Sequence, residues 1–219
     1  MSYLTKEMAM SAIRNMNSFH SDIVDAYSKY GMDLLDNLGR RNIVMSQAQE
    51  KFFAAALSKE YSHVDNDGRT GQPDIVIHSL DKELECKLTS KHKSGSISLQ
   101  TDYETLLQKG SLDYLYVIAD RNFKQFAVLH FEGLTIDDFR SPSPGSRGKV
   151  AMIKHKAMSK CNILLGDVID INLQEINKID KKLAETPATA LAATKKLMNR
   201  KTYWEDTPTK YSISLEDVS

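Results

Sequence analysis

Cysteine is scarce in this chain, with two residues, Cys86 and Cys161, among 219. Two isolated cysteines in a chain of this length argue against a disulfide framework and against a zinc site. Long apolar runs are missing too: no stretch approaches a membrane span, and the N-terminus has no apolar signal segment. We therefore expect a soluble, cytoplasmic protein with no membrane partner and with reduced thiols.

Net charge is also absent, because 29 Lys and Arg balance 29 Asp and Glu. The chain has no global basic excess to attract nucleic acid, so any such surface must be local. Two stretches, 82–93 and 140–160, are rich in Lys and Arg, and the second contains no acidic residue. A run this uneven in a neutral protein favours phosphate contact over an ordinary solvated face.

Several catalytic motifs are missing. The chain has no Gly-rich phosphate loop, no Gly-x-Ser-x-Gly and no histidine pair at zinc spacing, and its six histidines are scattered. We assign none of the histidines to catalysis.

The most informative stretch runs from Pro73 to Lys87. Apolar residues follow Asp74, a Ser-Leu-Asp turn comes next, and charged and apolar side chains then alternate, which predicts a β-hairpin. Glu83, Glu85 and Lys87 share one face of the second strand. A first strand that returns beside the second brings the Asp74 carboxylate near Glu85 and Lys87.

Two carboxylates and a lysine at one spot indicate metal-dependent chemistry. Close carboxylates repel unless a cation lies between them, and hard oxygen ligands suit Mg²⁺, for which Mn²⁺ can substitute. We expect Asp74, Glu85 and the Cys86 backbone carbonyl to bind the metal. Lys87 would orient or deprotonate a water, if its pKa is lowered, or neutralise phosphate charge. The alternative is that Glu83, Glu85 and Lys87 are the solvated face of an amphipathic strand.

The pattern Pro73-Asp74, ten intervening residues, then Glu85-Cys86-Lys87 resembles the signature of the PD-(D/E)XK nucleases, the restriction-endonuclease-like superfamily. The motif is short, and the resemblance covers residues 45–131. It implies an α/β fold with a central mixed β-sheet flanked by helices, here with extra N- and C-terminal helices. It also implies catalytic roles for Asp74, Glu85 and Lys87.

Within that superfamily the chain most resembles a type II restriction endonuclease. The resemblance implies a prokaryotic or phage-encoded, Mg²⁺-dependent enzyme that cuts double-stranded DNA at specific sequences and leaves 5′-phosphates. It further implies a homodimer, and a companion methyltransferase in the host that is not a physical partner. The alternatives are a structure-specific or repair nuclease of the same superfamily (a Holliday-junction resolvase, a nickase or an exonuclease) and a non-catalytic DNA-binding module.

The rest of the chain is assigned around this core as one nuclease domain, 1–219. We expect a helical part at 1–40 broken near Gly31, whose Met-rich stripe packs in the core or forms a cap or dimer surface. A helix over Ser46–Tyr61, N-capped by Ser46, opens the catalytic core at 45–131. Glu50 falls in its first turn. Superfamily members often carry an acidic residue on this helix, which makes Glu50 a tentative metal ligand; the alternative is a Glu favoured by the helix dipole.

After the hairpin, the pattern predicts a short helix over Leu99–Gln108 and strands over Leu112–Ala119 and Gln125–Phe131, which complete a four- or five-stranded mixed sheet. A basic loop and DNA-recognition region at 140–172 follows, with a late strand within Asn162–Asn172, and then a helical part at 173–219. The tentative DNA-binding residues are Arg69, Gln72, Lys91, Lys93, Gln100, Arg140, Arg147, Lys149, Lys154, Lys156 and Lys160.

Overall fold

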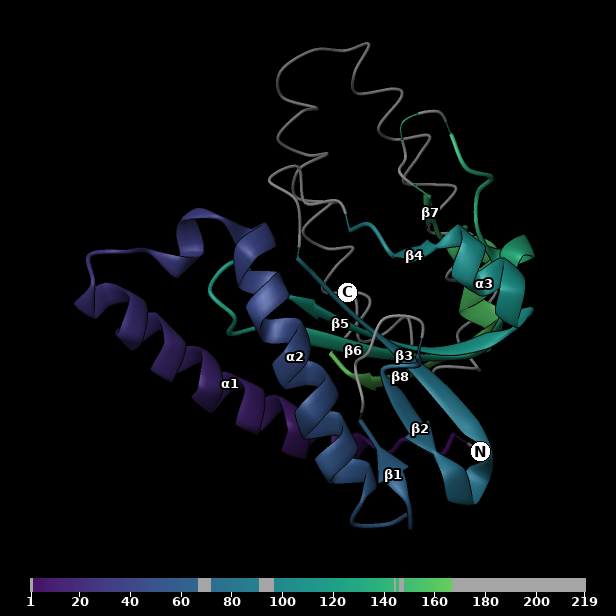
Figure 1. Cartoon of the computed structure of the whole chain (residues 1–219), viewed down its shortest axis with the longest axis horizontal. Helices are drawn as coiled ribbons and strands as arrows, with labels where there is room; N and C mark the ends of the chain where they lie inside the picture. Colours follow the sequence, from purple (N-terminus) through teal and green to yellow (C-terminus); the bar gives the residue numbers. More distant parts are fainter. Residues whose placement is uncertain (1, 67–71, 91–96, 144, 146–147, 167–219) are drawn as a thin grey trace, which may run out of the picture. The chain divides into compact units, whose positions relative to one another are not determined.

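The computed structural model describes residues 2–66, 72–90, 97–143, 145 and 148–166 (Figure 1). The chain divides into two units, Met1–Gly166 and Asp167–Ser219, and the second lies outside the described residues. The helical part expected at 173–219 therefore lies outside them as well. Within the described ranges, no helix is both long and apolar enough to cross a membrane.

Helices, 3-10 helices (η) and strands follow one another along the first unit. Their order is α1 (Lys6–Lys29), η1 (Leu34–Asp36), α2 (Leu38–Leu57), β1 (Val64–Asp65), β2 (Ile75–Ile77), η2 (His78–Leu80), β3 (Lys82–Ser90), β4 (Gln100–Asp102), α3 (Tyr103–Lys109), β5 (Leu112–Ala119), β6 (Phe126–Leu134), η3 (Ile136–Asp138), β7 (Lys149–Ala151), α4 (Lys154–Ala157), η4 (Met158–Lys160) and β8 (Cys161–Leu165).

The central sheet has six strands in the order β1-β2-β3-β5-β6-β8. Its β3–β5 pair is parallel, and its other neighbouring pairs are antiparallel. All positions of β5 are buried, as expected for an apolar strand rich in β-branched and aromatic residues inside a covered sheet. The predicted mixed α/β architecture is confirmed, with six strands where four or five were expected.

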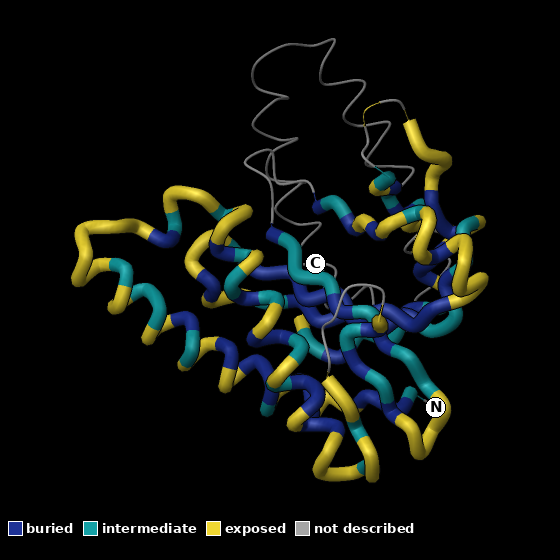
Figure 2. The backbone as a smooth tube through the Cα atoms, viewed as in Figure 1, coloured by how far each residue is buried: buried dark blue, intermediate teal, exposed yellow. Residues whose placement is uncertain are grey.

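Different elements cover the two faces of the sheet (Figures 1 and 2). On one face α1 and α2 contribute Met16 and Met45 to a core shared with Leu115 and Val117 of β5. The predicted packing of the Met-rich N-terminal stripe in the core is thus confirmed. On the other face Tyr114 of β5 contacts Phe139 in the segment after β6 and Thr101 of a separate ribbon of β4 and β7, and α3 packs beside β4.

The two long helices begin at side-chain caps. Thr5 accepts a hydrogen bond from the Met8 N–H at the start of α1, and Gly31 at φ +68° follows its end, where the break was predicted. The expected start of the second helix was wrong. Asn37, not Ser46, is the N-cap of α2, and Ser46 lies inside the helix.

The helix expected over Leu99–Gln108 is only partly right. Gln100–Asp102 is strand β4, and α3 begins at Tyr103. Asp102 caps it by accepting from the Thr105 N–H at 3.0 Å. An acceptor at this position favours a helix start at Tyr103 rather than four residues earlier at Leu99.

Arg41 anchors α2 to the sheet. It is fully buried, and its guanidinium donates to the backbone carbonyls of Asp120 and Arg121 in the β5–β6 turn and to Ser90 Oγ at the end of β3. The guanidinium carbon also lies 5.1 Å from the centre of the Phe123 ring. These contacts satisfy a buried cation with dipoles and an aromatic face. They tie together three segments that are distant in sequence.

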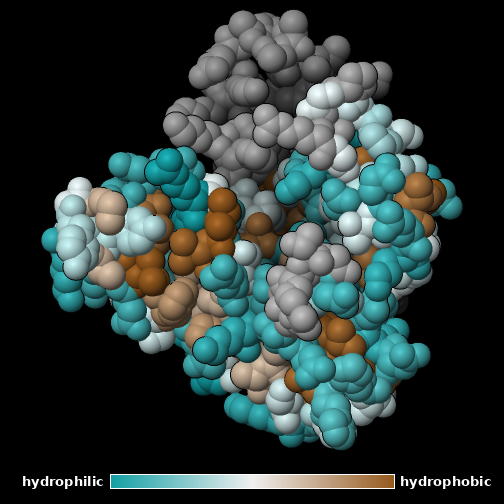
Figure 3. Space-filling view, in the orientation of Figure 1, coloured by the Kyte–Doolittle hydropathy of each residue, from teal (hydrophilic) through white to brown (hydrophobic). Residues whose placement is uncertain are grey.

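Hydrophobic residues are also visible on the surface near the connection between α1 and α2 (Figure 3). Tyr30, Met32 and Ile43 in this region are 80%, 51% and 69% exposed. The homodimer expected from the resemblance stays a prediction.

Candidate active site

The predicted hairpin is confirmed as β2 and β3. The register pairs Ile75 with Leu84 and Ile77 with Lys82. The turn between them is η2, and Asp81 closes it at φ +51°, a left-handed conformation that Asp tolerates better than most residues.

Asp74 lies at the point where β2 begins. Continuing the register by one residue places Asp74 opposite Glu85. The Asp74 Oδ2 accepts a hydrogen bond from the Cys86 N–H at 2.7 Å. A carboxylate therefore occupies the place beside β3 where a further β2 carbonyl would otherwise pair with that N–H.

Glu85 and Lys87 follow on the same face of β3 and form an ion pair between Glu85 Oε1 and Lys87 Nζ. Their side chains are 19% and 31% exposed, so both groups are largely withdrawn from water. The structure thus brings Asp74, Glu85 and the Cys86 backbone together as the sequence predicted, with Lys87 held on Glu85.

The electrostatics of this cluster show crowded negative charge. Burial raises the pKa of Asp74 to about 6, and the Glu85 charge adds to the rise, while Lys87 and the Cys86 N–H oppose it. Burial lowers the pKa of Lys87, but the charge and hydrogen bond of Glu85 more than offset this, so the pKa lies above its ordinary value. Lys87 is therefore a cation at neutral pH, and a role as a base is not favoured by these neighbours.

Glu50 belongs to the same electrostatic neighbourhood. It lies in the middle of α2, not in the first turn that was expected. Helix-dipole effects are confined to the terminal turns, so the dipole does not explain an acid at this position. Burial and then the charge of Asp74 raise the pKa of Glu50 to about 7. Desolvation and a second carboxylate therefore both favour its protonated form.

The donor set suits a hard divalent cation. Among the described residues, no group of three or more His, Cys, Asp or Glu side chains is placed to hold a metal ion. Mg²⁺ needs fewer protein donors than that, because it keeps several waters and is often bound by one or two carboxylates. Asp74 and Glu85 supply two carboxylates, and a cation there would relieve their repulsion, which adds to the rise that burial causes in the pKa of Asp74.

The tentative DNA-binding residues fall into three groups. Those exposed at the surface are Gln72, Gln100, Arg140, Lys149, Lys154 and Lys156. Those outside the described residues are Arg69, Lys91, Lys93 and Arg147. The remaining one, Lys160, forms an ion pair at 2.7 Å with the buried Asp138, which gives it a structural partner.

Two polar residues near the site were not found from the sequence. Tyr114, opposite Glu85 on β5, has its hydroxyl 2.8 Å from Thr101 Oγ1. Tyr114 was missed because it lies in an apolar strand, where an aromatic side chain is expected to serve the core. Gln49, next to Glu50, is fully buried and donates to the Leu115 carbonyl at 3.0 Å. A glutamine within the apolar stripe of α2 was the available signal.

No family model, no curated protein and no solved structure matches this chain.

Proposed function

We propose that this chain is a Mg²⁺-dependent endonuclease of restriction-endonuclease-like fold, which cuts double-stranded DNA at specific sequences in the manner of a type II restriction enzyme. The observation that carries the proposal is the convergence of Asp74, Glu85 and Lys87 at the start of β2, with Asp74 bonded to the Cys86 N–H. Their order and spacing are those of the PD-(D/E)XK signature.

The burial of the cluster supports catalysis over an ordinary solvated strand face. Glu83, on the same face and two residues earlier, has a side chain that is 39% exposed and pairs with Lys109. Glu85 is half as exposed as Glu83, at 19%, and lies beside a second carboxylate. Keeping repelling carboxylates together costs folding free energy, so such a cluster is more typical of functional sites than of strand surfaces.

Each group of the site has a role in phosphodiester hydrolysis. Asp74 and Glu85 would hold Mg²⁺, with the Cys86 carbonyl as a further candidate ligand, and Glu50 would contact the metal through one of its bound waters. A bound Mg²⁺ polarises the phosphate and lowers the pKa of a bound water. Lys87, a cation held on Glu85, would orient the attacking water and offset charge on the phosphate.

The reaction adds water to the phosphorus while the bond from phosphorus to the 3′ oxygen breaks. The 3′ oxygen takes a proton, and the other fragment keeps a 5′-phosphate. One such site per chain cuts both strands of a palindromic sequence most simply as a twofold homodimer.

The test is to incubate the purified protein with bacteriophage genomic DNA and Mg²⁺, with an EDTA control. Discrete fragments that require Mg²⁺ support a sequence-specific endonuclease. A metal-dependent smear would replace this assignment with a non-specific nuclease, and cleavage confined to branched DNA would replace it with a resolvase. Binding without any cleavage would leave a non-catalytic DNA-binding module.

A further inference from the structure

The ribbon of β4 and β7 has one buried and one exposed face. Thr101 and Val150 are buried. Gln100, Asp102 and Lys149 are exposed. The antiparallel register pairs Gln100 with Ala151 and Asp102 with Lys149. Directly opposed residues point to the same face, so these four share the outer face of the ribbon.

Arg140 extends this outer face from a third segment of the chain. Phe139 pairs with Met152, and the Arg140 N–H donates to the Ala151 carbonyl at 2.9 Å. Arg140 therefore lies opposite Ala151, whose partner on the other side is Gln100. Gln100, Ala151 and Arg140 form a row across three segments, with the small Ala151 in the middle.

The inner face of the ribbon is bonded to β5. Thr101 Oγ1 lies 2.8 Å from the Tyr114 hydroxyl, and the Tyr116 hydroxyl donates to the Gln100 carbonyl at 3.0 Å. Just before β4, the Ser98 carbonyl accepts from Thr89 Oγ1 of β3 at 3.3 Å. Three hydrogen bonds thus hold this segment against the face of the sheet.

That face is the one that carries the candidate catalytic groups. In the parallel β3–β5 pair, Tyr114 is the partner of Glu85 and Tyr116 is the partner of Lys87. Tyr114 therefore stands between the two: its hydroxyl is bonded to Thr101 of the ribbon, and its partner on β3 is Glu85 of the candidate site. The ribbon is therefore fixed one side-chain layer from the proposed site of cleavage.

We propose that the outer face of the β4–β7 ribbon, with Gln100, Arg140 and Lys149, contacts duplex DNA and contributes to its sequence specificity; this deepens the proposed function and rests on it. The major groove admits a two-stranded β-ribbon, in which Arg pairs with guanine and Gln with adenine, and Lys suits a phosphate. Ala151 leaves room for close approach. Asp102 is committed to the α3 cap, where it accepts from Thr105.

Other cations of the same basic stretch are directed toward protein acceptors. Lys154 Nζ donates to the Ile97 carbonyl at 2.8 Å, and Lys160 Nζ donates to the Gly133 carbonyl at 2.9 Å and to Asp138 at 2.7 Å. Among the described residues, these contacts favour the ribbon over Lys154 and Lys160 as the surface that meets DNA.

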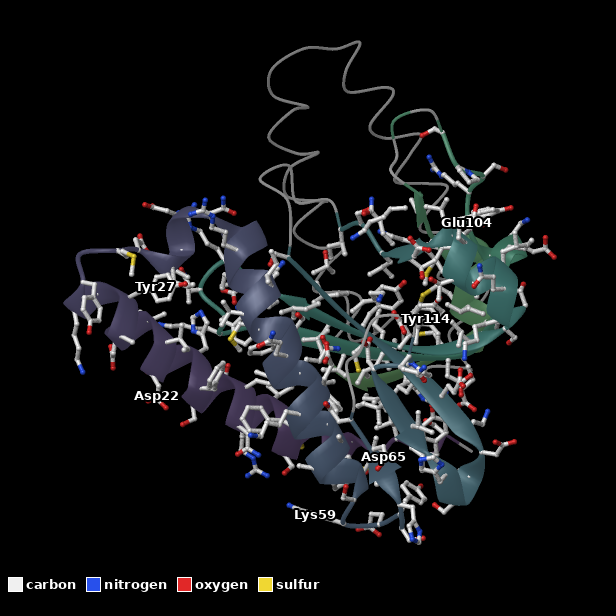
Figure 4. All side chains as sticks on the ribbon, in the orientation of Figure 1. Asp22, Tyr27, Lys59, Asp65, Glu104 and Tyr114 are labelled. Atoms are coloured by element: carbon white, nitrogen blue, oxygen red, sulfur yellow. The ribbon has the colours of Figure 1, made fainter. Side chains whose placement is uncertain are left out.

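The experiment compares Lys149→Ala and Gln100→Ala with matched controls in the full-length protein. Lys59→Ala and Gln125→Ala remove the same side-chain types from exposed positions elsewhere. In Figure 4, Lys59 lies at the bottom of the view, far from Glu104 at the upper right on α3, the helix that directly follows β4. Circular dichroism checks that each variant is folded.

Binding to a short labelled duplex is measured at several salt concentrations, and cleavage of bacteriophage genomic DNA is mapped. Lys149→Ala should weaken binding roughly tenfold and reduce the slope of log K against log salt by about 1, which a merely structural role would not do. Gln100→Ala should add cleavage at related sequences. The two controls should behave like the wild type.

These experiments can overturn the proposal for the ribbon and the proposed nuclease activity independently of each other. If the wild type cleaves while Lys149→Ala and Gln100→Ala bind and cut as it does, the ribbon proposal is overturned and the nuclease stands. If the wild type never cleaves but Lys149→Ala still weakens binding with a lower salt slope, the ribbon remains a DNA-binding surface and the nuclease is overturned.

Discussion

Replacing Asp74 by Asn should stabilise the metal-free protein at pH 8 while it weakens the proposed metal site. Asn keeps the oxygen that accepts from the Cys86 N–H and removes the charge. It therefore mimics the protonated form of Asp74, which burial and the Glu85 charge favour. Functional sites commonly trade folding stability for activity in this way.

The magnitude follows from the pKa of Asp74, about 6 against an ordinary value of 3.8. The full difference corresponds to about 3 kcal/mol of differential stability between the two protonation states. Because Asp74 is only partly buried, solvent screening reduces this to about 1 to 2 kcal/mol. In a chain of this length that is a rise in Tm of roughly 2 to 8 °C.

The direction of the Asp74 pKa shift determines the pH range in which Asp74→Asn should be more stable than the wild type. An acid whose pKa is raised by folding stabilises the fold fully below its ordinary pKa, and this stabilisation is lost as the pH rises through the folded value. The advantage of Asp74→Asn over the wild type should therefore be small near pH 4 and open up toward about pH 6, with no further growth above about pH 7.

The assay is thermal unfolding followed by circular dichroism in EDTA at pH 5 and pH 8. Asp22→Asn, on an exposed position of α1, is the matched control and should leave Tm unchanged at both pH values (Figure 4). Added Mg²⁺ should raise the Tm of the wild type and have less effect on Asp74→Asn. Equal or lower stability of Asp74→Asn at pH 8 would refute the argument that these carboxylates are crowded.

Three further predictions test neighbouring parts of the account. Glu50→Gln should also stabilise the metal-free protein at alkaline pH, because the pKa of Glu50 is about 7 against an ordinary 4.5, and it should raise the Mg²⁺ concentration needed for half-maximal cleavage. An unchanged Mg²⁺ dependence would remove Glu50 from the site. Arg41→Met should lower the free energy of unfolding in urea by about 3 kcal/mol, since it removes the donor from two partly buried backbone carbonyls and from the buried Ser90 hydroxyl; a loss under about 1 kcal/mol would contradict its anchoring role. Gly166→Ala should lower Tm more than Gly110→Ala, because both have φ +74° but a Cβ at 166 would lie 2.3 Å from the Phe126 carbonyl oxygen, while at 110 it meets nothing within 4 Å. Equal losses of Tm would show that backbone strain alone, and not the contact with the Phe126 carbonyl, determines the loss of stability.

The hairpin was predictable because residues close together in the sequence specify both of its strands and the turn between them. Period-two alternation from Glu83 to Leu88 specifies a strand, and the Ser-Leu-Asp turn returns the chain after three residues of β2. The opposition of Asp74 and Glu85 follows from that register alone. What the pattern could not supply was the depth of burial, which depends on α2 and on the ribbon over the other face.

The start of α2 was missed because two capping residues, Asn37 and Ser46, compete on local rules. The deciding residue is Arg41, which a pattern of apolar side chains places on the surface. Its partners are backbone carbonyls in the β5–β6 turn, some eighty positions away in the sequence. Helix propensity depends on neighbouring residues in the sequence, so it cannot indicate a contact with a turn this far away.

The ribbon was missed for a similar reason. Gln100-Thr101-Asp102 has little strand propensity, and it becomes β4 by pairing with β7, almost fifty residues later. Strand formation at such positions reflects long-range pairing and packing rather than intrinsic preference. Charge patterns are limited in the same way: Lys160 looked free in the sequence but pairs with a buried Asp138.

The most direct test of the central claim compares Glu85→Gln with Glu83→Gln in Mg²⁺-dependent DNA cleavage. The two glutamates lie two residues apart on the same face of β3, but only Glu85 stands beside Asp74, while Glu83 pairs with Lys109 at the surface. We predict that Glu85→Gln loses cleavage and that Glu83→Gln retains it. Equal activity of the two variants, or cleavage that persists in EDTA, would contradict the proposed site.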